Sequence, residues 1–378
     1  FERPQFQASA WLQMPFLRMS VDPTAAVTSA TFQPAWSGIG PFRPRERRPE
    51  RVTYLANAKY FDKDRPRIKQ IVEVAHPSIE DRCRALQNGE IDLIDFVPPR
   101  NREYVAKLPG TKLVKMTAPR VHFLHFNHNR PELRNPSLRR AIAYGVDRAA
   151  ICKRVGIALD KQNRLLTGPV PYGSFGYNLT VKDWPHELIL ARALVVAVKK
   201  ELKGLPPLTL AHQGNETTRM ACEEIVKQLK AIGVEVNLVE IDERSPDPRY
   251  ADMRYQTVVI SEPTFDLITL LTRDNPGLFD NAGPRLRALL VELLQVPNAT
   301  VASRLLPQLH QALQDDVAVL PLWQWYDEFL VADNVSGLPE VSPTVYAGVV
   351  DWNVKPRLPP ARWTTRTSAS APAKENRP

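Results

Sequence analysis

The chain has 378 residues, of which 43% are apolar and 24% charged, and this composition excludes a wholly disordered chain. The length predicts two or three domains with sizeable cores. The net charge is +9, but most of the excess lies in residues 43–51 and 356–378. The basicity is therefore peripheral, which argues against a nucleic-acid-binding protein.

The first third of the chain alternates strand and helix patterns. Strands are predicted over residues 51–55, 68–74 and 91–94, and a helix over 79–88. Ser78 is placed to cap that helix and Gly89 to end it. The order strand, helix, glycine, strand is typical of a βαβ-like unit. Two further strands are predicted over 112–116 and 120–127.

The middle of the chain carries the clearest helix signals. Asn135 and Pro136 begin a helix whose apolar positions recur up to Cys152, with the arginines mostly off that face. A helix over 187–202 is followed by a strand over 208–212, a helix over 216–232 and a strand over 234–241. The two strands of this last unit should be parallel.

The last third begins with a short strand over 257–260 and a polar, turn-rich stretch over 261–281. Amphipathic helices are predicted over 286–294 and 302–314, and an apolar strand over 317–326. Residues 356–378 are rich in Pro, Arg, Ser and Ala, which is typical of a disordered tail.

Signatures of catalysis and metal binding are weak. The sequence holds no GxSxG, HExxH, Walker A or GxGxxG motif, and its three cysteines form no CxxC pair. His122, His125 and His128 form HxxHxxH, but a strand points the middle histidine to the opposite face from the other two. We therefore expect no enzyme activity, no cofactor and no metal site.

Other polar and aromatic groups leave two interpretations open. Trp323 and Trp325 share a face of a predicted strand, where they either pack in a core or form the wall of a ligand pocket. Arg249, Arg254 and Tyr255 either hold an anionic group or lie on the surface. The acidic residues that follow, of which Glu262 is the first, either do acid–base chemistry or belong to a solvated loop.

Several segments together resemble the solute-binding proteins of bacterial ABC importers for dipeptides, oligopeptides and nickel (extracellular solute-binding protein family 5). Residues 38–43, GIGPFR, are similar to the family's Gly-Thr-Gly-Pro-Tyr segment. Residues 84–92, RALQNGEID, resemble its Ala-Leu-x-x-Gly-Glu-x-Asp motif. The most specific match is Phe126-Asn127 followed by residues 135–148, NPSLRRAIAYGVDR. Residues 229–234 and 320–322 are consistent with the family further along.

The resemblance implies an α/β fold, a two-lobed periplasmic-binding-protein-like clamp (type II-like) that closes over its ligand. Mapped onto this chain, residues 1–122 belong to the first lobe, 123–261 form the second lobe, 262–355 return to the first, and 356–378 are the disordered tail. The chain would cross between lobes near residues 123–127 and 257–262. Few residues precede Gly38, so the first lobe is expected to be incomplete and the chain to be a processed or truncated product.

The resemblance also implies the site and the partners. The expected ligand-binding residues are Phe126, Asn127, Arg254, Tyr255, Glu262, Trp323 and Trp325. The expected ligand is a peptide-like or other small solute. The expected partner is the membrane permease of an ABC transporter, the protein itself being a periplasmic or extracytoplasmic monomer that binds no nucleic acid. Peptide-binding members hold the ligand's α-amine with an acidic residue just after the second crossing strand, where this chain has Val258 and Val259.

A second interpretation is a cytoplasmic effector-sensing domain of a transcriptional regulator, since similar clamps are fused to DNA-binding domains. A third, binding of RNA or DNA through the basic edges, predicts a steep salt dependence of binding.

Overall fold

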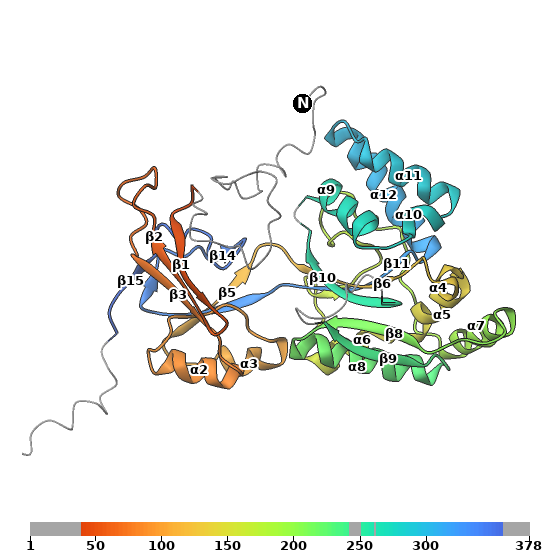
Figure 1. Cartoon of the computed structure of the whole chain (residues 1–378), viewed down its shortest axis with the longest axis horizontal. Coiled ribbons are helices and arrows are strands. Elements are labelled where there is room, and N and C mark those ends of the chain that lie inside the picture. The colour runs from red at the N-terminus through yellow and green to blue at the C-terminus, as the bar shows by residue number, and fades with distance from the viewer. Residues whose placement is uncertain (1–38, 242–250, 261, 358–378) are drawn as a thin grey trace, which may run out of the picture. The chain divides into compact units, whose positions relative to one another are not determined.

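The computed structural model describes residues 39–241, 251–260 and 262–357 (Figure 1). Within these ranges the chain forms two compact units. Unit 1 consists of residues 98–100 and 117–327, and unit 2 of the residues up to 97, 101–116 and those from 328 onward. The tail predicted to be disordered lies outside the described residues from position 358, as does Arg249.

The limits of these units do not coincide with the lobe limits predicted from the sequence. The units divide at 97/98, 100/101, 116/117 and 327/328, whereas the prediction places the divisions at 122/123 and 261/262. The physical reason is strand pairing. The segments expected to cross between lobes, near residues 123–127 and 257–262, lie largely on two neighbouring antiparallel strands, residues 120–126 and 253–259, which hydrogen-bond to each other inside unit 1.

Unit 1 is built on a six-stranded mixed sheet with the order β7-β11-β6-β10-β8-β9. The central pairs β11–β6 and β6–β10 are antiparallel, and β10–β8 and β8–β9 are parallel. The strands are β6 (Arg120–Phe126), β7 (Arg164–Leu165), β8 (Leu208–Gln213), β9 (Val236–Ile241), β10 (Met253–Val259) and β11 (Val319–Trp325).

Helices cover this sheet, and one face carries the largest apolar core of the unit. That core joins Val121 and Phe123 of β6 to leucines of the four helices α9 to α12. The helices of unit 1 are α4 (Pro131–Arg134), α5 (Pro136–Gly145), α6 (Arg148–Val155), α7 (Leu188–Glu201), α8 (Glu216–Ala231), α9 (Pro263–Ile268), α10 (Leu278–Asn281), α11 (Pro284–Leu294) and α12 (Ala299–Asp316). A π-helical turn, Thr269–Arg273, continues α9.

Unit 2 holds three small sheets, with the orders β1-β2-β3, β14-β5-β12-β4 and β13-β15. Two apolar clusters support them, one beneath α2 and one around Phe329 and Trp352. The elements are β1 (Phe42–Arg48), β2 (Arg51–Ala56), β3 (Gln70–Val74), α2 (Ile79–Gln87), β4 (Leu93–Ile94), α3 (Arg102–Val105), β5 (Thr111–Met116), β12 (Glu328–Ala332), β13 (Val335–Ser336), β14 (Val341–Ser342) and β15 (Asn353–Val354). A 3-10 turn, Pro99–Asn101, precedes α3.

The predicted parallel unit is confirmed, because β8 and β9 pair in parallel on either side of α8. The first predicted βαβ-like unit is wrong. β3 pairs with β2 and β4 pairs with β12, so these two strands belong to different sheets. The helix predicted from Pro136 to Cys152 is two helices, since Asp147 leaves the helical conformation and accepts a hydrogen bond from the backbone N–H of Ala150 as the cap of α6.

All three cysteines, Cys83, Cys152 and Cys222, are free thiols buried in the interior. Burial is the main reason that the pKa of each thiol is raised, to about 12 for Cys152. Among the described residues, no helix is both long enough and apolar enough to span a lipid bilayer.

Candidate functional site

Two of the predicted ligand-binding residues, Tyr255 and Trp323, lie in the core of unit 1 around His122. The three residues come from β10, β11 and β6, and the strand register sets Trp323 beside His122. The Tyr255 hydroxyl lies 2.7 Å from Nδ1 of His122, and the Trp323 ring stacks on the imidazole at 5.4 Å between ring centres. The sequence left open whether Trp323 lies in a core or in a pocket wall, and the structure places it in the core.

Burial also fixes the charge of this cluster. Desolvation, and to a lesser degree the nearby Arg120, lowers the pKa of His122 to about 3, and burial raises the pKa of Tyr255. Both side chains are therefore neutral near pH 7. A neutral, enclosed imidazole–phenol pair stabilises the packing of three strands against one another.

Phe126 and Asn127 mark the other end of β6. The Phe126 side chain is fully buried, whereas the Asn127 side chain stabilises a turn by accepting the N–H of Asn129 and donating to the Ala251 carbonyl. Both residues line a cavity of about 10 Å³ in unit 1, which also touches Arg254. That volume holds about one water molecule. The structure thus brings three predicted residues together, but not around a space for a solute.

Arg254 and Glu262 are the two predicted residues whose side chains are partly exposed. The Arg254 guanidinium donates to the Gln256 side chain and to the Asp274 carbonyl, both at 2.6 Å. The Glu262 carboxylate caps α9, accepting the backbone N–H of Phe265 at 2.8 Å. Both groups have structural hydrogen bonds, and both keep part of their surface accessible.

Trp325, the last predicted residue, lies where β11 ends, and its register partner on β6 is Arg120. Arg120 donates from Nε to the Asp327 carboxylate at 2.7 Å. The second oxygen of Asp327 is buried and has no hydrogen-bond partner in the structure. We call Arg120, Trp325 and Asp327 the strand-end cluster. Sequence reasoning missed Arg120 and Asp327, although each lies beside a predicted strand end.

A second arginine lies on the strand next to the strand-end cluster. Arg164 of β7 is the register partner of Gln324, and its guanidinium carbon lies 3.6 Å from the centre of the Tyr172 ring. Gln324 accepts the backbone N–H of Tyr172 at 2.7 Å and thereby fixes this loop. One end of the six-stranded sheet therefore carries two cations, a carboxylate and an aromatic ring, which together suit a polar solute.

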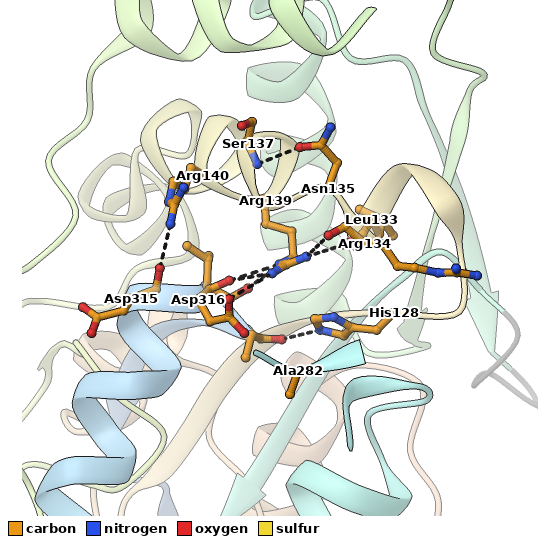
Figure 2. Close-up of polar contacts among 12 residues, drawn as sticks. His128, Leu133, Arg134, Asn135, Ser137, Arg139, Arg140, Ala282, Asp315 and Asp316 are labelled. Atoms are coloured by element: carbon orange, nitrogen blue, oxygen red, sulfur yellow. Dashed lines mark hydrogen bonds and ion pairs between the residues drawn. The ribbon is translucent and has the colours of Figure 1, made fainter. Parts of the chain in front are cut away.

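The most specific sequence motif, residues 135–148, serves a different purpose. Figure 2 shows the Arg139 guanidinium surrounded by main-chain carbonyls, including those of Leu133, Arg134 and Asp316. Asn135 begins α5 by accepting the N–H of Ser137 at 2.9 Å. These contacts hold helix ends in place.

Arg148, the last residue of that motif, repeats the pattern. Its buried guanidinium donates to the carbonyls of Leu166, Pro321 and Trp184 and forms an ion pair with Asp183. The sequence analysis placed Arg139 and Arg148 mostly off the apolar face, and the structure instead buries both. Each is tolerated in the interior because carbonyl oxygens accept hydrogen bonds from its guanidinium.

The histidines of HxxHxxH do not converge. His122 and His125 point to opposite faces of β6, and His128, beyond the strand end, donates from Nε2 to the Ala318 carbonyl at 2.9 Å. Among the described residues, no three His, Cys, Asp or Glu side chains are grouped as metal ligands.

Comparison with known proteins assigns the chain to a family. The family model for "Bacterial extracellular solute-binding proteins, family 5 Middle" matches residues 1–274. The chain belongs to this family. The resemblance given by residues 84–92 and 135–148 is thereby confirmed, and the family is one of binding proteins and not of enzymes.

Curated relatives and solved structures agree with this assignment. The chain is 22% identical over 313 residues to the probable D,D-dipeptide-binding periplasmic protein DdpA of Escherichia coli, covering 80% of this chain and 59% of that protein. Its fold matches the periplasmic binding protein DppA of Helicobacter pylori in complex with the peptide STSA, with a TM-score of 0.71, 18% identity, and 83% and 62% of the two chains covered. It also matches AgaA of A. tumefaciens R10 in complex with agropinic acid, with a TM-score of 0.70, 19% identity, and 85% and 68% covered.

These matches confirm the predicted fold class, that of the periplasmic binding proteins. The chain spans 38% to 59% of the length of the first three curated relatives. The names of these relatives describe binding proteins, so the alternative of a regulator's effector-sensing domain has no support among them.

Proposed function

We propose that this chain is the solute-binding component of an ABC importer, and that it holds a peptide-like or other small solute for delivery to the membrane permease. The observation that carries the proposal is the fold match to binding proteins that hold a peptide in one case and agropinic acid in the other. Membership of the family supports the same function. Binding and release of the solute, without bond-making chemistry, is the proposed activity.

The proposal places the protein outside the cytoplasm, in the periplasm or at the outer side of the membrane. The family description refers to extracellular proteins, and the relative DdpA is described as periplasmic. The proposed partner is the permease that receives the solute.

For the site we propose the end of the six-stranded sheet in unit 1 that carries the strand-end cluster. Arg120 is partly exposed, and one oxygen of Asp327 has no partner within the structure. A solute with both a carboxylate and a hydrogen-bond donor, such as a peptide or an opine, suits this pair. Of the residues predicted from sequence, Trp325 belongs to this cluster. Glu262 keeps its predicted role as part of the proposal because its side chain is partly exposed. Arg254 pairs with His125 at the other end of β6 and is left out of the proposed site.

The test is a thermal-shift screen of the purified chain against dipeptides, tripeptides, opines, sugars and nickel complexes, followed by calorimetry on any positive class. A solute at about a hundred times its Kd should stabilise the folded state by about 2.7 kcal/mol. The absence of a shift with every class at millimolar solute would overturn the proposal.

The location of the site has its own test. Arg120→Gln should weaken binding of a carboxylate-bearing solute by about tenfold or more, because a charged hydrogen bond is lost. Arg254→Gln provides the comparison at the other end of β6. If Arg254→Gln abolishes binding while Arg120→Gln leaves it unchanged, the strand-end cluster is not the site.

A further inference from the structure

Only one side of helix α7 (Leu188–Glu201) packs against the rest of unit 1. Its Ala191, Val195 and Val198 are buried, and the helix packs mainly against α5. Figure 1 shows α7 at the periphery of unit 1. The other side of the helix therefore faces outward.

That outward side is apolar. Ile189 is 85% exposed, Val196 68% and Leu190 43%. The exposed residues Ala193 and Ala197 lie between them, so the positions repeat at the three- and four-residue steps of one helix face. Single exposed apolar side chains are ordinary, but a contiguous row of them on one helix marks a surface that a membrane or another molecule covers. We call these five residues the α7 apolar stripe.

Cations border the α7 apolar stripe. Four basic residues are exposed in the helix and the turn after it, against the two carboxylates of Glu187 and Glu201: Arg192, Lys199, Lys200 and Lys203. The Arg192 side chain reaches the end of α8, where it donates to the Ala231 carbonyl at 3.0 Å and where Lys230 is exposed. The Glu201 carboxylate accepts a hydrogen bond from the Asn135 side chain.

We propose that the α7 apolar stripe and its basic border bind the surface of an anionic lipid bilayer. Two signals are combined here, aliphatic side chains that enter the boundary between headgroups and acyl chains, and cations that remain among the phosphates. Long lysine and arginine side chains beside an apolar face suit this position because their stems lie along apolar surface while the charge reaches water. The excess of cations selects anionic over neutral lipid.

A protein partner is the competing occupant, and the stripe favours lipid over it. Its side chains are all aliphatic, without the aromatic anchors that are enriched at the centres of protein interfaces. A fluid bilayer needs no shape complementarity with a convex helix. This inference goes beyond the proposed function and does not depend on any solute, so its failure would leave the proposed function untouched.

The experiment is co-sedimentation of the full chain with vesicles of pure phosphatidylcholine and of phosphatidylcholine mixed with phosphatidylglycerol. We expect binding to the anionic vesicles at low salt, none to the neutral ones, and release as salt rises. The double variant I189S/V196S should lose about tenfold or more in vesicle affinity, since two large apolar contacts are removed. The double variant K199Q/K200Q should lose about tenfold, from two cations near the headgroups.

A matched control is available on another helix of the same unit. Val291 and Leu294 of α11 are also exposed, so V291S/L294S removes the same kind of surface elsewhere. It should bind anionic vesicles as the unchanged protein does. Equal losses in the control and in I189S/V196S would overturn the proposal, and so would a lack of binding to anionic vesicles at low salt. Concentration-dependent self-association that I189S/V196S abolishes, without vesicle binding, would assign the stripe to a second copy of the chain instead.

Discussion

Arg139 is a polar side chain whose loss should strongly destabilise this fold. Its side chain is 4% exposed, and its five donor contacts reach four carbonyl oxygens at 2.7–3.3 Å, those of Leu133, Arg134, Asp316 and Val317. Burial lowers the pKa of this guanidinium to about 10, partly offset by Asp316, so it remains charged near pH 7.

The size of the effect follows from those contacts. A hydrogen bond from a charged donor contributes about 1.5–3 kcal/mol, and a buried acceptor left without a partner costs about 1–3 kcal/mol. The contributions are not additive, since removing one guanidinium also removes its own desolvation cost. We therefore expect Arg139→Met to lower the free energy of unfolding by about 3–5 kcal/mol.

The assay is urea unfolding followed by circular dichroism, and the neighbouring arginine is the control. Arg140 makes a single exposed hydrogen bond, to the Asp315 carbonyl at 3.0 Å (Figure 2), so Arg140→Met should cost about 1 kcal/mol or less. If the two variants lose similar amounts of unfolding free energy, the view that Arg139 stabilises the fold more than an exposed arginine does is refuted.

Three further predictions concern unit 1. Burial is the main reason that the pKa of His125 is about 3 in the folded protein, below its value of 6.5 in the unfolded chain. The stability that the neutral imidazole contributes to the folded state is therefore present above pH 6.5 and is lost as pH falls toward 3. Between pH 7 and pH 5 this one group should cost about 2 kcal/mol of stability, and H125L should show a correspondingly flatter pH dependence in denaturant titrations; an unchanged slope would contradict it. Gly156→Ala should destabilise by about 2–4 kcal/mol, since its φ is +83° and a Cβ would lie 2.6 Å from a backbone atom, whereas Gly173→Ala, with φ +86° and open space, should cost about 1 kcal/mol; thermal unfolding compares the two, and equal shifts would count against the steric argument. Tyr255→Phe should cost about 1–2 kcal/mol by leaving Nδ1 of His122 without its partner, which urea midpoints at pH 7 measure; no change would show that the contact contributes nothing.

Local signals account for the parts of the fold that the sequence predicts well. The Asn215 cap, the apolar face of α8 and Gly233 define β8, α8 and β9 without reference to the rest of the chain. The stretch 261–281 was expected to be polar and turn-rich, yet it contains α9, a π-helical turn and α10. These helices are too short to stand on intrinsic propensity, and the core that they share with α11 and α12 stabilises them.

Tertiary context explains why the site was harder to predict. Alternation along β11 correctly groups Trp323 with Trp325, but only the neighbouring strands show that His122 stacks on the first and that Arg120 lies beside the second. The burial of Arg139 and Arg148 was missed for the same reason. Carbonyls that accept hydrogen bonds from these two guanidinium groups come from segments distant in the chain. Periodicity indicates which face of a helix or strand a residue lies on, but it does not indicate which other residues its side chain contacts.

The burial of Cys83, Cys152 and Cys222 gives this chain a practical property. Their thiols are enclosed and hard to ionise, so they should react slowly with maleimide reagents in the native state. A single cysteine introduced at an exposed position would then accept a fluorophore selectively, without prior replacement of the natural three. The protein is thus suited to labelling at one chosen position.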